Sequence, residues 1–172
     1  MTYRFLIISS VAATLMGCAT WGADPVATAE LQPASGSSVK GTVHFEQHKH
    51  GMVKVSGKIR GLAPESEHGF HIHEKGDCSS ADGSSAGGHF NPGNAGHGKH
   101  GRGTRHAGDL PNLRANAEGV ATLEYETDQI SLNGDANITE LAVVVHADPD
   151  DFTSQPAGNA GTRLACGVVK LQ

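Results

Sequence analysis

Two histidines separated by one residue stand out in the stretch GFHIHEKGDC, residues 69–78. In an extended strand successive side chains alternate between the two faces, so His71 and His73 would point to one side and Ile72 to the other. Two imidazoles on one face of a strand can bind the same metal ion. The alternative for an isolated pair is a solvated polar strand end, so the rest of the chain has to decide.

A second group of candidate ligands lies in the glycine-rich stretch GGHFNPGNAGHGKHGRGTRHAGDLPNL. His89, His97 and His106 are spaced by eight and nine residues, and Asp109 follows three residues later. Three imidazoles and one carboxylate fill all four positions of tetrahedral zinc, which is typical of a structural site. The glycines would let the loop fold back so that the ligands converge. The alternative is a set of solvated loop histidines.

A further histidine ends the strongly apolar segment in VVVHADPDD. His146 lies on the same strand face as Val144, where a lone histidine is more often a satisfied core residue. Together with His71 and His73, it would place three imidazoles at strand ends. Cu²⁺ prefers nitrogen ligands in near-square geometry, so these three residues are candidate copper ligands.

The elements that must position these residues are predicted to be short strands. VKGTVHFEQ alternates apolar and polar residues from Val39, HKHG makes a turn, and MVKVSGKIRG repeats the alternation, which predicts a hairpin. Further strands are predicted in VATLEYETDQISL, ELAVVVHAD and LACGVVKLQ, and no segment shows a helical stripe. We therefore predict an all-β fold, a Greek-key β-barrel or sandwich of about eight antiparallel strands.

Two long segments with little hydrophobic content interrupt these strands, at residues 74–118 and 147–162. Long loops in a compact domain are usually functional or disordered. Because both begin at strand ends that carry histidines, we interpret them as functional loops.

The composition limits the class of protein. The 172 residues suit one domain, and 13 Lys and Arg against 18 Asp and Glu give a formal charge of −5. No basic stripe is available to neutralise phosphates, so we expect no nucleic-acid partner. Aromatic residues make up only 5% of the chain, so the core must be built from Val, Leu, Ile and Ala.

The first 17 residues are predicted to be a signal peptide, with a short basic start and an apolar run too short to span a bilayer comfortably. LMGC, residues 15–18, resembles the lipobox of bacterial lipoproteins, although Met16 is an unusual residue before the glycine. Cys18 would then be the lipidated first residue of the mature chain. Ordinary signal-peptidase cleavage, for example after Ala19, is the alternative.

Residues 18–37 are predicted to be the lipidated start and a flexible tether, because they are small and polar with two prolines. Residues 38–172 form the predicted domain. With Cys18 lipidated or removed, Cys78 and Cys166 remain. An exported protein with two cysteines most simply forms one disulfide.

Five motifs in this order resemble copper/zinc superoxide dismutases from about residue 36 to residue 172: GFHIHEKGDC, AGGHFNP, RHAGDLPN, VVVHADPDD and GNAGTRLACGVV. The resemblance implies an enzyme that converts superoxide into dioxygen and hydrogen peroxide, with one copper and one zinc per chain. The copper ligands that it implies are His71, His73, His89 and His146. The zinc ligands that it implies are His89, His97, His106 and Asp109, so His89 would bridge the two metals.

The resemblance also implies roles for other residues. Cys78 and Cys166 match the intrachain disulfide of the family, and Arg163 matches the arginine beside the copper. Asp150 matches the carboxylate that orients one histidine ligand of each metal. In the implied reaction copper alternates between two oxidation states, which zinc cannot do, while His89 takes up and returns a proton. Arg163 would attract the superoxide anion.

The chain departs from many relatives in two places. In HGKHG, His100 adds a nitrogen donor within reach of the zinc loop, or is only a surface group. The second long loop lacks the acidic and lysine-rich insertion of eukaryotic relatives. Its segment SQPAGNAG is similar to bacterial sequences. Steering of superoxide would then rest on Arg163. Weaker candidates for steering are Lys99, Arg102 and Arg105.

The resulting prediction is an exported enzyme of the bacterial periplasm that acts on superoxide and contacts the membrane only through a lipid on Cys18. The resemblance leaves a homodimer open. The alternative is a periplasmic protein that binds or buffers copper and zinc without turnover, which His44, His48 and His50 would fit. Degenerate relatives usually lack a copper ligand or the arginine. All of those positions are filled here, which favours the enzyme.

Overall fold

The computed structural model describes residues 24–172, and its regular elements are almost all strands. Alternating apolar and polar residues produce the longer ones, as the sequence predicts. The strands are β1 (Val26–Pro33), β2 (Lys40–Gln47), β3 (Val53–Arg60), β4 (Glu67–His68), β5 (Phe70–His73), β6 (Leu113–Arg114), β7 (Val120–Thr127), β8 (Ala142–His146) and β9 (Arg163–Leu171). Two short 3-10 helices, η1 (Lys49–Gly51) and η2 (Ser84–Ala86), lie in the predicted hairpin turn and in the first long loop.

Seven strands form one antiparallel sheet in the order β5-β8-β9-β1-β2-β3-β7, and β4 pairs with β6 in a second sheet. The last two strands of the chain insert between β5 and β1, which is a Greek-key crossing. A bridge from Ala115 to Ala121 connects the end of β6 to β7, while β4 leads directly into β5. The small sheet therefore connects the two ends of the large sheet, β5 and β7. The predicted all-β Greek-key barrel is confirmed.

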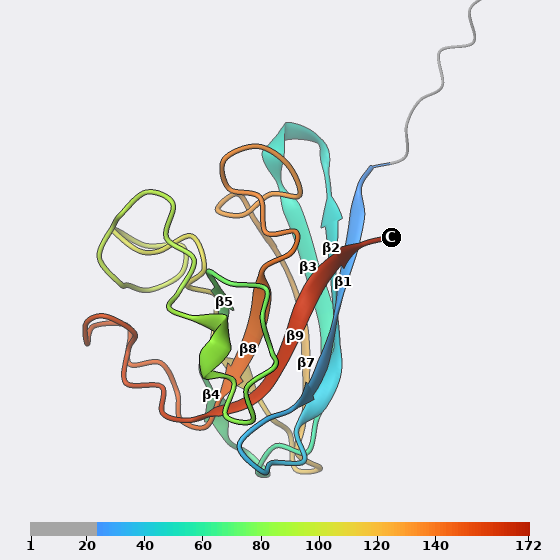
Figure 1. Ribbon diagram of the computed structural model, residues 1–172, viewed down its shortest axis with the longest axis vertical. Coiled ribbons are helices and arrows are strands. Elements are labelled where there is room, and N and C mark those ends of the chain that lie inside the picture. The colour runs from blue at the N-terminus through green and yellow to red at the C-terminus, as the bar shows by residue number, and fades with distance from the viewer. Residues whose placement is uncertain (1–23) are drawn as a thin grey trace, which may run out of the picture.

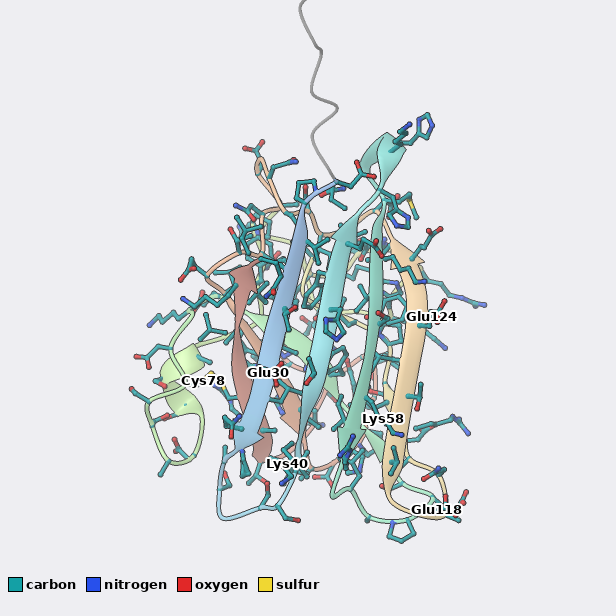
Figure 2. The ribbon with its side chains drawn as sticks, turned by 90° about the vertical axis from the view of Figure 1, so that its right-hand side faces the viewer. Glu30, Lys40, Lys58, Cys78, Glu118 and Glu124 are labelled. Carbon is teal, nitrogen blue, oxygen red and sulfur yellow. A yellow bond between two sulfur atoms is a disulfide. The ribbon has the colours of Figure 1, made fainter. Side chains whose placement is uncertain are left out.

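The inner faces of the strands enclose one apolar core. Phe45, Ile59 and Ile72 are fully buried, and each such side chain stabilises the fold by about 1.5–3 kcal/mol. The outward face of β1, β2, β3 and β7 carries polar and charged side chains such as Glu30, Lys40, Lys58 and Glu124 (Figure 2). The long loops gather at the other side of the molecule, beside β5 and β8 (Figure 1).

Strand β1 lies within the segment predicted from the sequence to be a flexible tether. It pairs with β2 on one side and β9 on the other, and Ala27, Ala29 and Leu31 point into the core. The expectation of a flexible tether over residues 18–37 is therefore wrong from Val26 onward. The alternation of apolar residues is present in β1, but two of its three members are alanine, which buries little area and gives a weak strand signal.

The predicted signal peptide, residues 1–17, and the predicted lipid-bearing Cys18 lie outside the described residues. Within residues 24–172, no helix combines the length and apolar character needed to cross a membrane.

The first long loop returns along the free edge of β5. The main-chain N–H of Phe90 donates to the carbonyl oxygen of Ile72 at 2.8 Å, and the N–H of Ile72 donates to the carbonyl of Gly108 at 3.0 Å. A Cβ atom on Gly108 would lie 2.3 Å from the Ile72 oxygen, so only glycine permits this close approach. The loop thereby covers an open strand edge and is fixed beside the histidines of β5.

Candidate metal centre

Four buried histidines converge at the ends of β5 and β8. Each offers one ring nitrogen, and these nitrogens all lie within 4.8 Å of one another. We call these residues the four-histidine group: His71, His73, His89 and His146. The alternation of β5 places His71 and His73 on one face, as the sequence predicts, and β8 pairs with β5 so that His146 joins them.

A hydrogen bond from Nδ1 to a main-chain carbonyl orients the rings of His73 and His146. His73 Nδ1–H donates to the carbonyl oxygen of Gly87 at 2.9 Å, and His146 Nδ1–H donates to the carbonyl of Gly161 at 3.3 Å. The Nε2 atoms of His73 and His146 then face each other at 3.2 Å. Histidine ligands of metals are commonly held by such hydrogen bonds from the nitrogen that does not bind the metal.

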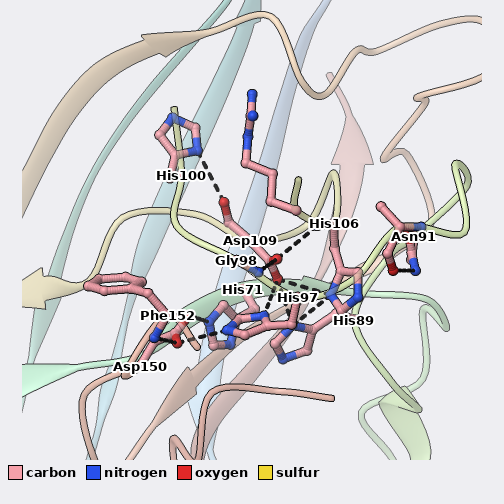
Figure 3. A network of polar contacts seen from close by, with 12 residues as sticks. His71, His89, Asn91, His97, Gly98, His100, His106, Asp109, Asp150 and Phe152 are labelled. Carbon is pink, nitrogen blue, oxygen red and sulfur yellow. Dashed lines mark hydrogen bonds and ion pairs between the residues drawn. The ribbon is translucent and has the colours of Figure 1, made fainter. Parts of the chain in front are cut away.

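A second group surrounds one carboxylate of the first loop (Figure 3). We call it the aspartate group: His89, His97, His106 and Asp109. The distances from Asp109 Oδ1 are 2.8 Å to His89 Nδ1, 3.0 Å to His97 Nδ1 and 3.2 Å to His106 Nδ1. The other oxygen, Oδ2, accepts main-chain hydrogen bonds from Gly98 at 3.0 Å and His106 at 2.8 Å. One oxygen is thus held by the backbone while the other meets the three nitrogens.

His89 belongs to both groups because its two nitrogens face opposite ways. Nδ1 approaches Asp109, whereas Nε2 is buried and has no hydrogen-bond partner. His71 Nδ1 is also buried without a partner. Buried polar atoms without partners cost free energy unless they bind something, and imidazole nitrogen is a preferred ligand of copper and zinc. The donor sets of both groups therefore fit metal ions.

Asp150 connects the two groups from the second long loop. Its Oδ2 lies 3.0 Å from His71 Nε2, and its Oδ1 lies 2.9 Å from His97 Nε2 (Figure 3). The side-chain amide of Asn112 holds the main chain of Asp150 by two hydrogen bonds, at 3.0 and 3.1 Å. A Cβ atom on Gly158 would lie 1.9 Å from Asp150 Oδ1, so this glycine leaves room for the carboxylate.

Burial keeps the histidines of β5 and β8 neutral. It lowers the pKa of His71 to about 4 against the opposing effect of Asp150, and it lowers the pKa of His146 to about 3. Burial also lowers the pKa of His73 well below its ordinary value. These rings are ready to bind a metal at neutral pH without first losing a proton.

His97 in the aspartate group has the opposite electrostatics, whereas burial lowers the pKa of His106 in the same group. Burial lowers the pKa of His97, but the carboxylates of Asp109 and Asp150 outweigh it and raise that pKa to about 9. Burial would raise the pKa of Asp109, yet contacts with His89 and His97 hold it well below its usual range. In the metal-free protein at pH 7, His97 is therefore a cation between two carboxylates.

A cavity of about 240 Å³ opens onto the four-histidine group and is lined by His73, His89, His146, Arg163 and residues 155–157 and 159–161. The guanidinium of Arg163 donates to the carbonyl oxygens of Gly83 and Gly87, both at 2.7 Å. Among the described residues that line this cavity, Arg163 is the one arginine or lysine. The second-loop residues that line it, 155–157 and 159–161, are neutral.

The disulfide between Cys78 and Cys166 ties the first loop to β9, and the two cysteines are 88 positions apart in the chain. Cross-linking a loop of this length stabilises a fold by roughly 4–5 kcal/mol in the chain-entropy account. The same bond fixes the loop that carries Gly83 and Gly87, whose carbonyls hold Arg163. The disulfide pairing is confirmed, and it helps to place the guanidinium.

The other first-loop residues that the sequence suggests for ligation or steering lie outside the two groups. His100 is half-buried and donates from Nδ1 to the main-chain carbonyl of Asp109 at 3.1 Å. The ammonium of Lys99 lies 5.0 Å from the ring of Phe152, and Arg105 donates to Gln129. Neither these two cations nor Arg102 lines the cavity above the four-histidine group.

The hairpin histidines are engaged separately. His44 Nδ1 lies 3.2 Å from Thr28 Oγ1, and His48 Nδ1 lies 3.1 Å from a carboxylate oxygen of Glu126. In residues 24–172, the four-histidine group and the aspartate group are the only clusters placed to hold a metal. An auxiliary site at His44, His48 and His50 is therefore not supported.

Three supporting residues were missed by sequence reasoning. His68 is buried and donates from Nδ1 to the carbonyl oxygen of His146 at 2.8 Å, while its Nε2 meets Ser66 Oγ at 2.6 Å. Asn112 holds Asp150, and Gln155 holds His97. The sequence could have pointed to His68, because it stands just before the HxH pair in EHGFHIH. Asn112 and Gln155 stand in loops, where amide side chains carry no spacing pattern.

A Greek-key barrel in which one histidine is shared between a four-histidine group and a three-histidine, one-aspartate group defines the class of enzymes with paired copper and zinc sites. The sequence model of copper/zinc superoxide dismutase (SODC) matches residues 39–169. The chain belongs to this family.

A curated relative supports the same family, and a solved structure supports the fold. The chain is 45% identical over 145 residues to superoxide dismutase [Cu-Zn] 3 of Arabidopsis thaliana, covering 81% of this chain and 87% of the plant protein. It is similar in structure to the clock protein EA4, with a TM-score of 0.79 and 38% identity over 88% of this chain and 98% of the other. The protein is thus an oxidoreductase that dismutates superoxide with copper and zinc as cofactors.

Proposed function

We propose that each metal occupies one of the two groups. Copper is held by the four-histidine group and zinc by the aspartate group. The observation that carries this assignment is the position of His89, which presents one nitrogen to each group. Four nitrogens suit copper, and three nitrogens with one carboxylate oxygen suit closed tetrahedral zinc.

Copper, when bound, supplies one-electron chemistry in both directions, so that two superoxide ions and two protons give dioxygen and hydrogen peroxide. The protein's own residues bring in the anion and the proton. Arg163 attracts superoxide because it is the one arginine or lysine among the described residues lining the cavity, and two carbonyl oxygens fix its direction. His89 would hold the proton at Nε2 when that nitrogen is not bound to copper, because Nδ1 stays engaged with the aspartate group.

Asp150 supports both halves of this site. It accepts hydrogen bonds from His71 and His97, one from each group, and so fixes which nitrogen of each ring faces the metal. We assign it an orienting role. We assign Asp109 to zinc because one of its oxygens is directed at the three histidines while the backbone holds the other.

The test is metal analysis and a superoxide-consumption assay on the same preparation of the mature protein. We expect one copper and one zinc per chain together with fast dismutation. His44→Ala is the matched control, since His44 lies outside both groups and should leave metal content and rate unchanged. A protein that holds both metals but does not consume superoxide would support the buffering alternative.

We also propose that the protein is exported to a bacterial periplasm, with residues 1–17 as the signal peptide and a lipid on Cys18. The disulfide between Cys78 and Cys166 supports export, because such bonds persist mainly in oxidising compartments. Labelled palmitate should attach to the protein in cells and be absent from Cys18→Ser. A soluble, unlabelled product would favour ordinary signal cleavage. The homodimer stays a prediction of the family resemblance, which sedimentation velocity would check.

A further inference from the structure

Gln155 joins the two long loops through its side-chain amide. Its Oε1 accepts a hydrogen bond from the main-chain N–H of His97 at 2.9 Å, and its Nε2 donates to the main-chain carbonyl of His97 at 3.0 Å. One amide therefore satisfies both main-chain groups of His97, as a neighbouring strand would. The two residues are 58 positions apart in the chain.

The contact fixes a residue whose ring is already held twice. His97 Nδ1 faces Asp109 in the aspartate group, and His97 Nε2 meets Asp150 at 2.9 Å. Asp150 and Gln155 both belong to the second loop. That loop therefore holds the ring of His97 through Asp150 and the main chain of His97 through Gln155.

Gln155 also lines the cavity above the four-histidine group, together with Pro156 and Ala157. The same short segment thus lines the cavity above the four-histidine group and contacts the aspartate group through the amide of Gln155. Glutamine suits this position because its amide carries both a donor and an acceptor, whereas glutamate cannot donate and methionine can do neither.

We propose that Gln155 is a positioning residue, which fixes the zinc ligand His97 from the wall of the copper channel. The inference rests on the proposed assignment of the aspartate group to zinc. Residues that support a metal ligand in this way typically change metal affinity by about 10- to 100-fold when they are replaced. We expect the effect of Gln155 near the lower end, about 10-fold, because Asp150 still orients the ring of His97.

The barrel offers a matched control. Gln47 makes a similar pair of main-chain contacts at the far hairpin, but to two different residues: its Oε1 accepts from the N–H of Leu132 at 2.9 Å and its Nε2 donates to the carbonyl of Met52 at 3.0 Å. Gln47 touches neither metal group. Gln155→Met and Gln47→Met therefore both remove an amide that bridges two main-chain groups, one at the site and one in the barrel. Gln47 is buried and also accepts from Ser131 Oγ at 2.9 Å, whereas Gln155 is exposed, so Gln47→Met is the more severe test of a general loss of stability.

The experiment compares zinc release from the copper- and zinc-loaded wild type and variants to a chelator. A second readout is the visible spectrum of Co²⁺ placed in the zinc site, which reports ligand geometry and not fold stability. We expect Gln155→Met to release zinc about 10-fold faster and to shift the Co²⁺ bands. Gln155→Glu, which keeps the acceptor and loses the donor, should fall between Gln155→Met and wild type. Gln47→Met should lower the melting temperature and leave both readouts unchanged.

Wild-type zinc release and an unshifted Co²⁺ spectrum in both Gln155 variants would overturn the inference. Equal acceleration in Gln47→Met would overturn it too, because the effect would then reflect general stability. His97→Ala separates these results from a failure of the zinc assignment. If that variant retains zinc as tightly as wild type, the proposed zinc site in the aspartate group is wrong. The proposed role of Gln155 would then be wrong too.

Discussion

The four-histidine group and the aspartate group share His89 but are positioned by different parts of the fold. Three members of the four-histidine group lie on β5 and β8, inside the hydrogen-bonded sheet. All members of the aspartate group lie in the first loop, which has no long strand of its own. Its order comes from main-chain contacts along the edge of β5 and from side chains of the second loop.

The electrostatic difference follows the structural one. Burial among apolar strands leaves the histidines of β5 and β8 neutral, with the pKa of His71 lowered to about 4 and that of His146 to about 3. The aspartate group instead holds a charged His97 between carboxylates, and the pKa of His97 is raised to about 9. The strands thus hold the rings of His71 and His146 neutral before any metal binds, whereas a metal at the aspartate group would have to displace a proton.

The largest expected contrast comes from removing one ligand from each group. His73→Ala should abolish dismutation while the melting temperature stays close to wild type, because the barrel holds the remaining ligands. Asp109→Ala should first lose zinc and melt at a lower temperature, because the loop depends on that carboxylate. Metal analysis, calorimetry and the superoxide assay would show both effects. Equal losses of metal and stability in the two variants would remove the distinction.

Arg163 tests the electrostatics of the channel on the copper side. Arg163→Glu should slow the second-order reaction by about 10- to 1,000-fold, because the one arginine or lysine that lines the cavity within residues 24–172 is replaced by a charge that repels superoxide. Arg163→Lys should slow the reaction less than Arg163→Glu does, since lysine keeps the positive charge and loses only the planar guanidinium. Both variants should hold normal copper and zinc.

Ionic strength sharpens this test. Exposed charges are screened over about 10 Å at 0.1 M salt, so the wild-type rate should fall as salt rises. That dependence should flatten or reverse in Arg163→Glu. Arg105→Glu is the control, because Arg105 does not line the cavity. A wild-type rate and salt dependence in Arg163→Glu would move the steering role elsewhere.

Proton release on metal binding gives a smaller but direct comparison of the groups. At pH 7 the copper-side histidines of β5 and β8 are already neutral, since their pKa values lie below 7, whereas His97 with its pKa of about 9 is protonated. Zinc must displace that proton, so its binding should release about one proton per chain from His97. Titration calorimetry in buffers of different ionisation enthalpy would measure it. No proton release on zinc binding at pH 7 would contradict the charged state of His97.

Sequence pattern recovered the residues whose chemistry depends on local spacing. The HxH pair follows from strand alternation, and the convergence of His89, His97 and His106 follows from ligand type and loop glycines. The amide contacts of Asn112 and Gln155 could not be predicted, because they join loops far apart in the chain and use side-chain groups that most polar loop residues share. Strand β1 was missed for another reason: its inward alanines are small, so the alternation carries little hydrophobic signal.

The central claim is that the two differently built groups share His89. The most direct measurement is the electron paramagnetic resonance spectrum of Cu²⁺ before and after selective removal of zinc, with copper content checked in both samples. The shared ligand predicts an altered copper spectrum after zinc removal, because His89 is then held by Asp109 and not by a metal on its Nδ1 side. An unchanged copper spectrum in a sample shown to lack zinc would contradict the bridge.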